Sequence, residues 1–161
     1  MRHLTGTEYC KVDVNERFKM PKKFLEQLNL SSTRLFCVRK KLDDNALELF
    51  TDERFQKEMD WITTYLNSDG DDEEQLLFNA LTNIKHIYLD DADRLPLPKE
   101  LKQVAEIGNE VVIKGVGGHF ELYSKEDYEK QCEAIKQSEK SLKDLRAALT
   151  KQAREKEQRP L

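Results

Sequence analysis

The chain of 161 residues has few of the residues that build disulfide frameworks, metal centres or catalytic sites. Its three cysteines, Cys10, Cys37 and Cys132, are odd in number, widely spaced and form no Cys-x-x-Cys pair. This pattern favours reduced thiols over disulfides or a zinc motif. The three histidines show neither metal-ligand spacing nor a triad context. We therefore expect no metal and no cofactor.

Long apolar segments are missing as well. No apolar run approaches the roughly 18 residues of a membrane span, and the first residues lack the apolar core of a signal peptide. The glycines at 115, 117 and 118 lack the lysine and the strand-to-helix setting of a phosphate loop, so they predict a tight hairpin turn. We expect a cytoplasmic protein that is not an enzyme and has no small-molecule substrate.

What the chain does contain is a segment that occurs twice. Asp13-Val-Asn-Glu-Arg17-Phe-Lys-Met-Pro21 returns as Asp90-Asp-Ala-Asp-Arg94-Leu-Pro-Leu-Pro98, so that acid, arginine and proline recur at a constant offset of 77 residues. The surrounding pattern predicts strand, turn, strand and short helix in each copy. One unit is therefore built twice, with each proline expected at the first helical position.

The residues within the first copy alternate in character. Phe18 and Met20 share one face of the expected strand, whereas Arg17 and Lys19 share the other, because successive side chains of a strand point in opposite directions. Arg17 is therefore expected at the turn, facing solvent. A longer helix is predicted to follow the strands of each copy, because Thr51 and Ser124 each precede an acidic first turn and suit the capping position.

Charge is distributed unevenly around the formal net of −4. Residues 1–41 carry ten basic and four acidic side chains, residues 42–93 carry three and fifteen, and residues 94–161 carry fourteen and twelve. The acidic segment 67–74 is typical of a linker between the copies. The basic residues of the first copy suit a phosphate-facing surface or an ordinary solvated one: Arg17, Lys19, Lys22, Lys23, Arg34, Arg39, Lys40 and Lys41.

The Asp-x-x-x-Arg motif allows two interpretations. It can be an ion pair across a turn, although exposed pairs contribute only about 0.2–1 kcal/mol to stability. Alternatively, a hairpin in the major groove presents the planar arginine to guanine O6 and N7 or to phosphate, while the acid holds its orientation. The apolar stripe near the C-terminus is likewise open between a partner helix and a solvated helix that frays.

Three features together resemble the MraZ family. They are Gly6-Thr-Glu-Tyr9 ahead of the first motif, the paired prolines, and Gly115-Val-Gly-Gly-His-Phe-Glu-Leu-Tyr-Ser124 near the end. MraZ proteins are bacterial transcriptional regulators with two AbrB-like (SpoVT-AbrB) swapped-hairpin halves in one chain. The resemblance implies an α+β fold in which two such repeats form a pseudo-symmetric, β-barrel-like core with peripheral helices and a C-terminal helix.

The resemblance also implies a domain division. It comprises a first AbrB-like repeat with its helix (6–66), an acidic linker with a short helix (67–84), a second AbrB-like repeat with its helix (85–135) and a charged C-terminal helix or tail (136–161). The implied function is that of a sequence-specific DNA-binding regulator of the division and cell-wall gene cluster. It would act in the nucleoid as a ring-shaped homo-oligomer on short promoter repeats of double-stranded DNA.

Arg17 and Arg94 take the role of the family's DNA-contacting arginines, with Asp13 and Asp90 as supports. The predicted DNA-binding set is completed by neighbours of the first motif: Asn15, Lys19 and Lys22. The family's usual lysine and glycine before the arginine are replaced by Asn15-Glu16 and Ala92-Asp93. We expect this loss of glycine to limit positive φ at the turns and the acids to repel phosphate.

Two consequences follow from these substitutions. The second copy is the less basic one, so we expect the first to dominate DNA contact. The acidic turns also keep a second class open, an oligomeric scaffold of the same fold that has lost DNA binding.

Overall fold

The computed structural model describes residues 2–28, 34–137 and 141–158. Over these residues the fold is α+β, with eight strands, six helices and antiparallel pairing in every strand pair. The chain divides into two units, Met1–Tyr128 and Glu129–Leu161. Within the described residues, no helix has both the length and the apolar character that a membrane crossing requires.

The elements follow one another in the same order twice. The first half contains β1 (Leu4–Lys11), β2 (Arg17–Lys19), α1 (Lys22–Leu28), β3 (Leu35–Lys40), β4 (Leu47–Thr51) and α2 (Asp52–Tyr65). Helix α3 (Asp72–Thr82) connects it to the second half. The second half contains β5 (Lys85–Tyr88), β6 (Arg94–Pro96), α4 (Lys99–Val104), β7 (Glu110–Gly117), β8 (Phe120–Ser124) and α5 (Lys125–Lys136).

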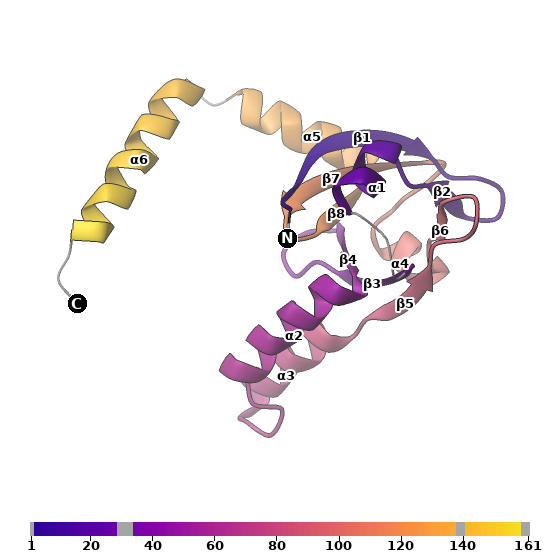
Figure 1. Ribbon diagram of the computed structural model, residues 1–161, viewed down its shortest axis with the longest axis horizontal. Helices are drawn as coiled ribbons and strands as arrows, with labels where there is room; N and C mark the ends of the chain where they lie inside the picture. Colours follow the sequence, from indigo (N-terminus) through magenta and orange to yellow (C-terminus); the bar gives the residue numbers. More distant parts are fainter. Residues whose placement is uncertain (1, 29–33, 138–140, 159–161) are drawn as a thin grey trace. The chain divides into compact units, whose positions relative to one another are not determined.

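The two halves exchange their first strands. The six-stranded sheet has the order β1-β7-β8-β4-β3-β5, so β1 pairs with the third strand of the second half and β5 with the third strand of the first (Figure 1). Strands β4 and β8 join the halves in the middle of this sheet, and β2 and β6 form a separate two-stranded sheet. Because each half supplies an outer strand to the other, neither half completes its sheet alone.

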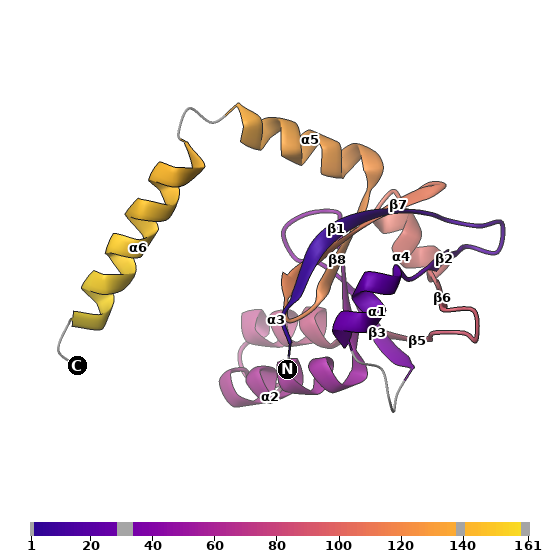
Figure 2. The same cartoon turned by 45° about the horizontal axis from the view of Figure 1, so that its top comes forward.

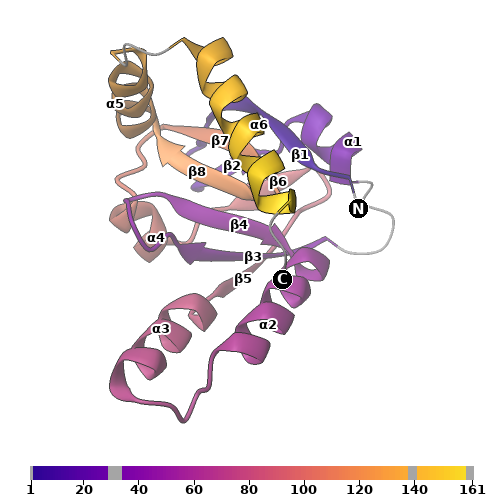
Figure 3. The same cartoon turned by 90° about the vertical axis from the view of Figure 1, so that its left-hand side faces the viewer.

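Apolar side chains from both halves form one core. The ring centroids of Phe24 in α1 and Phe120 in β8 lie 4.9 Å apart, and both side chains are fully buried. Phe18 and Met20 are buried together, as the strand alternation predicted. Helices α2 and α3 run side by side beyond the sheet (Figure 3). Burial of large apolar side chains from both halves is the main force that holds the halves together.

The predicted helix caps are confirmed. The Thr51 hydroxyl accepts a hydrogen bond from the Arg54 amide at 3.3 Å, and the Ser124 hydroxyl accepts one from the Asp127 amide at 3.1 Å. The expected position of the prolines was wrong by one residue, because α1 begins at Lys22 and Pro98 is the N-cap of α4, with an extended ψ of 131°. Each proline carbonyl instead accepts the first helical hydrogen bonds.

The glycine cluster forms the predicted hairpin turn between β7 and β8. Gly117 has φ of 97°, a conformation that glycine adopts without strain. A Cβ atom at Gly115 would lie 2.7 Å from the backbone of Leu4, so a glycine is required at this position, where β1 pairs with β7. Gly115 is therefore needed for the close pairing of the exchanged strand β1, whereas Gly117 is needed for the positive φ at the turn.

The second unit contains most of α5 and helix α6 (Leu142–Gln158). Leu142 and Leu149, part of the predicted apolar stripe, are 78% and 63% exposed. Residues 138–140 and 159–161 of the predicted segment 136–161 lie outside the described residues.

Candidate nucleic-acid interface

The first turn is held by the side chain of its first residue. The Asp13 carboxylate accepts hydrogen bonds from the amides of Asn15 at 2.9 Å and Arg17 at 3.0 Å. The Asp13 amide donates to the Arg17 carbonyl at 2.8 Å, and the Glu16 amide donates to the Asp13 carbonyl at 3.0 Å. An aspartate that binds amides a few residues ahead fixes a turn in this way.

The second turn repeats this geometry. The Asp90 carboxylate accepts from the amides of Ala92 and Arg94, both at 2.9 Å. The Asp90 amide donates to the Arg94 carbonyl at 2.9 Å, and the Asp93 amide donates to the Asp90 carbonyl at 3.0 Å. The hydrogen bond from the Arg17 amide is the largest cause that lowers the pKa of Asp13, and the hydrogen bond from the Arg94 amide has the same effect on Asp90. Burial has a smaller effect that raises both pKa values.

Pairing between β2 and β6 brings the two turns together. In this pairing Lys19 lies opposite Arg94. The Met20 amide donates to the Asp93 carbonyl and the Leu97 amide donates to the Glu16 carbonyl, each at 2.8 Å. Both turns extend on the same side of the first unit, away from α2 and α3 (Figures 1 and 2). The repeated motif therefore forms one surface feature with two arginines.

The two arginines contact a shared carboxylate. Arg94 Nε lies 3.1 Å from Asp90 Oδ2, and Arg17 Nη1 lies 3.4 Å from the same oxygen. Arg17 Nε also lies 3.4 Å from Asp13 Oδ2. The side chains of Arg17 and Arg94 are 28% and 38% exposed. Both arginine side chains are thus partly exposed, although Arg17 Nε itself is buried and each guanidinium group is close to an acid.

The residues before the arginines adopt positive φ without being glycine. Glu16 has φ of 60° and Asp93 has φ of 61°. The expectation that losing glycine limits positive φ was therefore wrong. The backbone is held there because the carbonyl of each of these residues accepts an amide from the other half. A left-handed conformation costs a non-glycine residue about 1–2 kcal/mol, which these contacts offset.

The acids beside the arginines have basic partners. Arg34 Nη2 lies 2.7 Å from Asp93 Oδ1 and donates to the Asp90 carbonyl at 2.6 Å. Lys102 Nζ lies 3.5 Å from Glu16 Oε1. The expected repulsion of phosphate is reduced by these neighbours. The sequence analysis did not identify these ion pairs, because Arg34 and Lys102 are distant in sequence from the acids that they contact.

The remaining predicted residues lie near the first turn. Asn15 is exposed within the turn, Lys19 is exposed on β2, and Lys22 is the exposed first residue of α1. Among the described residues, neither lysine has an ion-pair partner within 4.0 Å. These three side chains are therefore accessible to a polyanion that approaches the turn.

The expectation that Arg39 and Lys41 belong to the basic surface was wrong. Arg39 is 3% exposed and its guanidinium lies 3.1 Å from Glu48 and 2.6 Å from Glu58. Lys41 Nζ lies 2.9 Å from Glu121, which, together with further acidic neighbours, satisfies its charge. Both cations face carboxylates inside the fold because strand pairing brings acidic residues of β4 and β8 beside β3 and its following loop.

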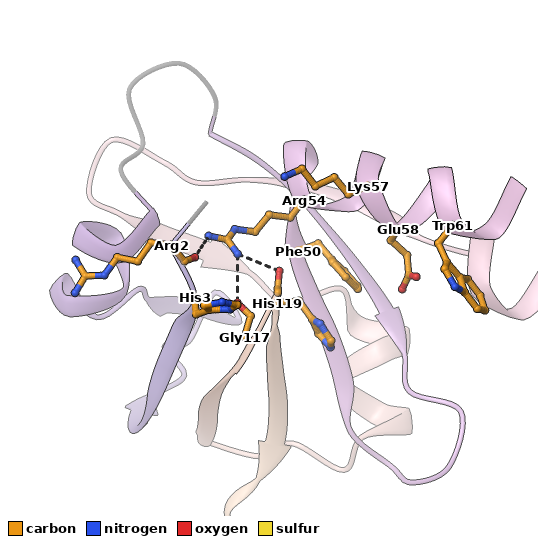
Figure 4. Close-up of a pocket in the computed structure, with 10 residues that line it drawn as sticks. Arg2, His3, Phe50, Arg54, Lys57, Glu58, Trp61, Gly117 and His119 are labelled. Atoms are coloured by element: carbon orange, nitrogen blue, oxygen red, sulfur yellow. Dashed lines mark hydrogen bonds between the residues drawn. The ribbon is translucent and has the colours of Figure 1, made fainter. Parts of the chain in front are cut away.

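A separate cavity of about 540 Å³ lies between the N-terminal segment, α2 and the β7–β8 turn (Figure 4). Arg54 donates to the carbonyl groups of Arg2 at 2.6 Å, Gly117 at 3.3 Å and Gly118 at 3.4 Å. Burial is the main cause that lowers the pKa of this arginine. Arg54 therefore links the N-terminal segment to the β7–β8 hairpin through hydrogen bonds from Nη1 and Nη2 to backbone carbonyl groups.

The fold and the paired turns define a class of protein. It is a single chain with two equivalent ββαββα halves that exchange their first strands and hold two Asp-x-x-x-Arg turns side by side.

A family model described as "MraZ protein, putative antitoxin-like" matches residues 80–151. A protein of Flavobacterium psychrophilum named transcriptional regulator MraZ is 28% identical over 130 residues, which cover 81% of this chain and 82% of the relative. The namesake from Christiangramia forsetii is 27% identical over 136 residues, 83% and 85% of the two chains. That from Mycoplasmoides gallisepticum is 34% identical over 94 residues, 56% and 63% of the two chains. The chain is thus similar to proteins named transcriptional regulator MraZ over most of its length, and its second half matches the MraZ family model.

Proposed function

We propose that this chain is a sequence-specific DNA-binding transcriptional regulator that inserts its paired turns into the major groove. The observation that carries the proposal is the joint surface position of Arg17 and Arg94. Each turn is fixed by an aspartate, so the arginine enters a complex with little backbone freedom left to lose. Arginine is the side chain whose planar fork best matches guanine O6 and N7 or a phosphate group.

The contacts of Arg17 with Asp13 and Asp90 are long, so contacts with DNA can replace them. Both of its carboxylate distances are 3.4 Å, whereas charge-assisted hydrogen bonds are about 2.7–2.9 Å long. Arg94 is closer to its acid, at 3.1 Å. A guanidinium group held loosely loses less when it turns toward DNA. This difference supports the proposal that the first turn dominates DNA contact.

The residues at the tips of the two turns also favour DNA contact by the first turn. Val14, between Asp13 and Asn15, is 97% exposed, and its counterpart in the second turn is the acidic Asp91. A fully exposed valine suits contact with a thymine methyl group, whereas an acid repels phosphate. We propose Asn15, Lys19 and Lys22 as further DNA contacts of the first half.

The proposal includes the architecture and assembly implied by the family. The two halves correspond to AbrB-like swapped-hairpin repeats around a barrel-like core. Copies of the chain form a ring that binds spaced promoter repeats of the division and cell-wall gene cluster, in the cytoplasm at the nucleoid. The basic first half and the acidic segment 67–74 supply unlike faces for head-to-tail contact. Many weak sites then bind firmly because later contacts form at high effective concentration.

A gel shift with DNA from upstream of the chain's own gene tests this function at two salt concentrations. Loss of affinity with added salt identifies phosphate contact, and a preference over scrambled DNA that survives identifies base reading. Sedimentation at micromolar concentration tests the ring, and a monomer alone contradicts it.

A second candidate is an oligomeric scaffold of the same fold without DNA binding. It is favoured by one observation, the pairing of both turn arginines with carboxylates. Oligomers with no salt-dependent DNA affinity would establish the scaffold and exclude the regulator.

A further inference from the structure

Three side chains of ligand type meet away from the arginine turns. They are Cys37 of β3, Asp52 at the start of α2 and His86 of β5. One ligand atom from each lies within 4.8 Å of the other two. Cys37 Sγ and Asp52 Oδ1 are 3.9 Å apart.

The exchanged strand creates this cluster. Cys37 and His86 are directly opposite in the pairing of β3 with β5, so their side chains stand on the same face of the sheet. Asp52 follows β4, the other neighbour of β3, and begins the helix that packs there. The three residues are far apart in sequence and form no spacing motif. The sequence analysis expected no metal site because no local spacing motif connects these three residues.

We propose that Cys37, Asp52 and His86 together bind one divalent transition-metal ion of the zinc type, with a fourth position open to water. Sulfur, imidazole nitrogen and carboxylate oxygen are the donors that zinc accepts, and three protein ligands with an open position are a usual arrangement. Calcium and magnesium prefer oxygen ligands, of which this set offers only one residue.

The geometry needs only a small adjustment. Bonds of about 2.3 Å to sulfur and about 2.0 Å to oxygen at a tetrahedral angle separate the two ligand atoms by about 3.5 Å. The separation of 3.9 Å between Cys37 Sγ and Asp52 Oδ1 is a few tenths of an ångström longer. A side-chain rotation within the present backbone can supply that difference.

The surroundings suit a bound cation. Cys37 is fully buried beside Phe50 and Phe55, whose low polarity strengthens a bond between metal and thiolate. His86 is exposed, so an ion can enter from solvent. Gln56 Nε2 donates to Asp52 Oδ1 at 3.3 Å and helps to orient the carboxylate. Among the described residues, no basic side chain lies within 4.0 Å of Asp52 to compete with a metal.

A metal at this position would connect the halves. Cys37 and Asp52 belong to the first half and His86 to the first strand of the second. An ion that binds only the folded chain stabilises it by mass action, so the melting temperature rises with metal concentration.

Cobalt(II) titration of the full chain, free of any affinity tag and of chelators, tests the site. We expect one equivalent to bind, with a thiolate-to-cobalt absorption band that Zn²⁺ abolishes by displacement. His86→Ala and Asp52→Asn should each weaken binding by about 100-fold, because loss of a direct ligand costs at least as much as loss of an outer-shell partner. Their positions are exposed or half-buried, so these variants should fold.

Matched controls come from residues outside the cluster. Cys132→Ser and His3→Ala should bind cobalt as the unchanged chain does, and Cys37→Ser should lose the thiolate band. The proposal is overturned if no thiolate band appears, or if both His86→Ala and Asp52→Asn retain full affinity. Circular dichroism of each variant separates loss of a ligand from loss of fold.

Discussion

Arg17 reaches from the first half of the chain to Asp90 of the second, with Nη1 3.4 Å from Oδ2. The same carboxylate holds Arg94, so one acid lies between the two arginines that we propose to contact DNA. Asp90 also accepts two backbone amides of its own turn. The shape of the second turn and the orientation of both arginines therefore depend on one ionised carboxyl group.

Acid should destabilise the protein through these turns. The pKa values of Asp13 and Asp90 lie below the ordinary 3.8, chiefly because the amides of Arg17 and Arg94 donate to the ionised form. The folded state thus binds these protons less tightly than the unfolded state. The stabilisation is complete above about pH 5 and is lost as the pH falls through the lowered values.

Thermal melts between pH 7 and pH 3 check this. Asp13→Asn and Asp90→Asn should show a shallower decrease of melting temperature with acid than the unchanged chain. Asp60→Asn, exposed on α2, should follow the unchanged chain. Equal slopes for all four proteins would show that the turn carboxylates do not contribute.

Glycine should be tolerated better than alanine where φ is positive. Glu16→Gly and Glu16→Ala both remove the ion pair with Lys102, but only glycine relieves the φ of 60°. We expect Glu16→Gly to exceed Glu16→Ala in free energy of unfolding by about 1 kcal/mol, after the entropy cost of glycine. Urea denaturation measures the difference, and a more stable alanine variant would exclude strain at this position.

Arg39 should matter for stability and not for DNA. Arg39→Met leaves Glu48 and Glu58 without their buried cation and should cost about 3–5 kcal/mol of unfolding free energy. Lys40→Met, at the exposed next residue, should change it by less than about 0.5 kcal/mol. Equal denaturation midpoints for the two variants would contradict the buried role of Arg39.

The local parts of this fold could be predicted from the sequence. The 77-residue offset predicted two equivalent units, and Thr51 and Ser124 marked helix starts because a cap depends on neighbours only three residues away. The exchange of β1 and β5 could not be predicted from the residues alone, because strand pairing over such separations leaves no periodic signal. Only the family resemblance implied swapped hairpins.

The residues of the candidate site could be predicted from the sequence, but their contacts could not. The motif located Arg17 and Arg94, but their shared contact with Asp90 arises from the pairing of β2 with β6. Arg39 was expected at the surface from charge alone. Its burial follows from Glu48, which lies opposite it on β4, and no local pattern reveals that partner.

The first turn should contribute more to DNA affinity than the second. Arg17→Ala should weaken binding by about 5-fold to 150-fold, the range of one good base contact. Arg94→Ala should weaken it less, because its turn carries Asp91 and Asp93. Lys57→Ala, exposed on α2 away from the turns, serves as control. A larger loss for Arg94→Ala in matched preparations would reverse this order.

The most direct measurement is DNA binding by the double variant Arg17→Ala/Arg94→Ala, followed by fluorescence anisotropy across a salt series. The account predicts that the variant melts as a folded protein but no longer prefers upstream DNA over scrambled DNA. The salt slope should decrease by about 0.9 for each phosphate group that the variant no longer binds. Unchanged affinity, preference and salt slope in the folded double variant would contradict the account.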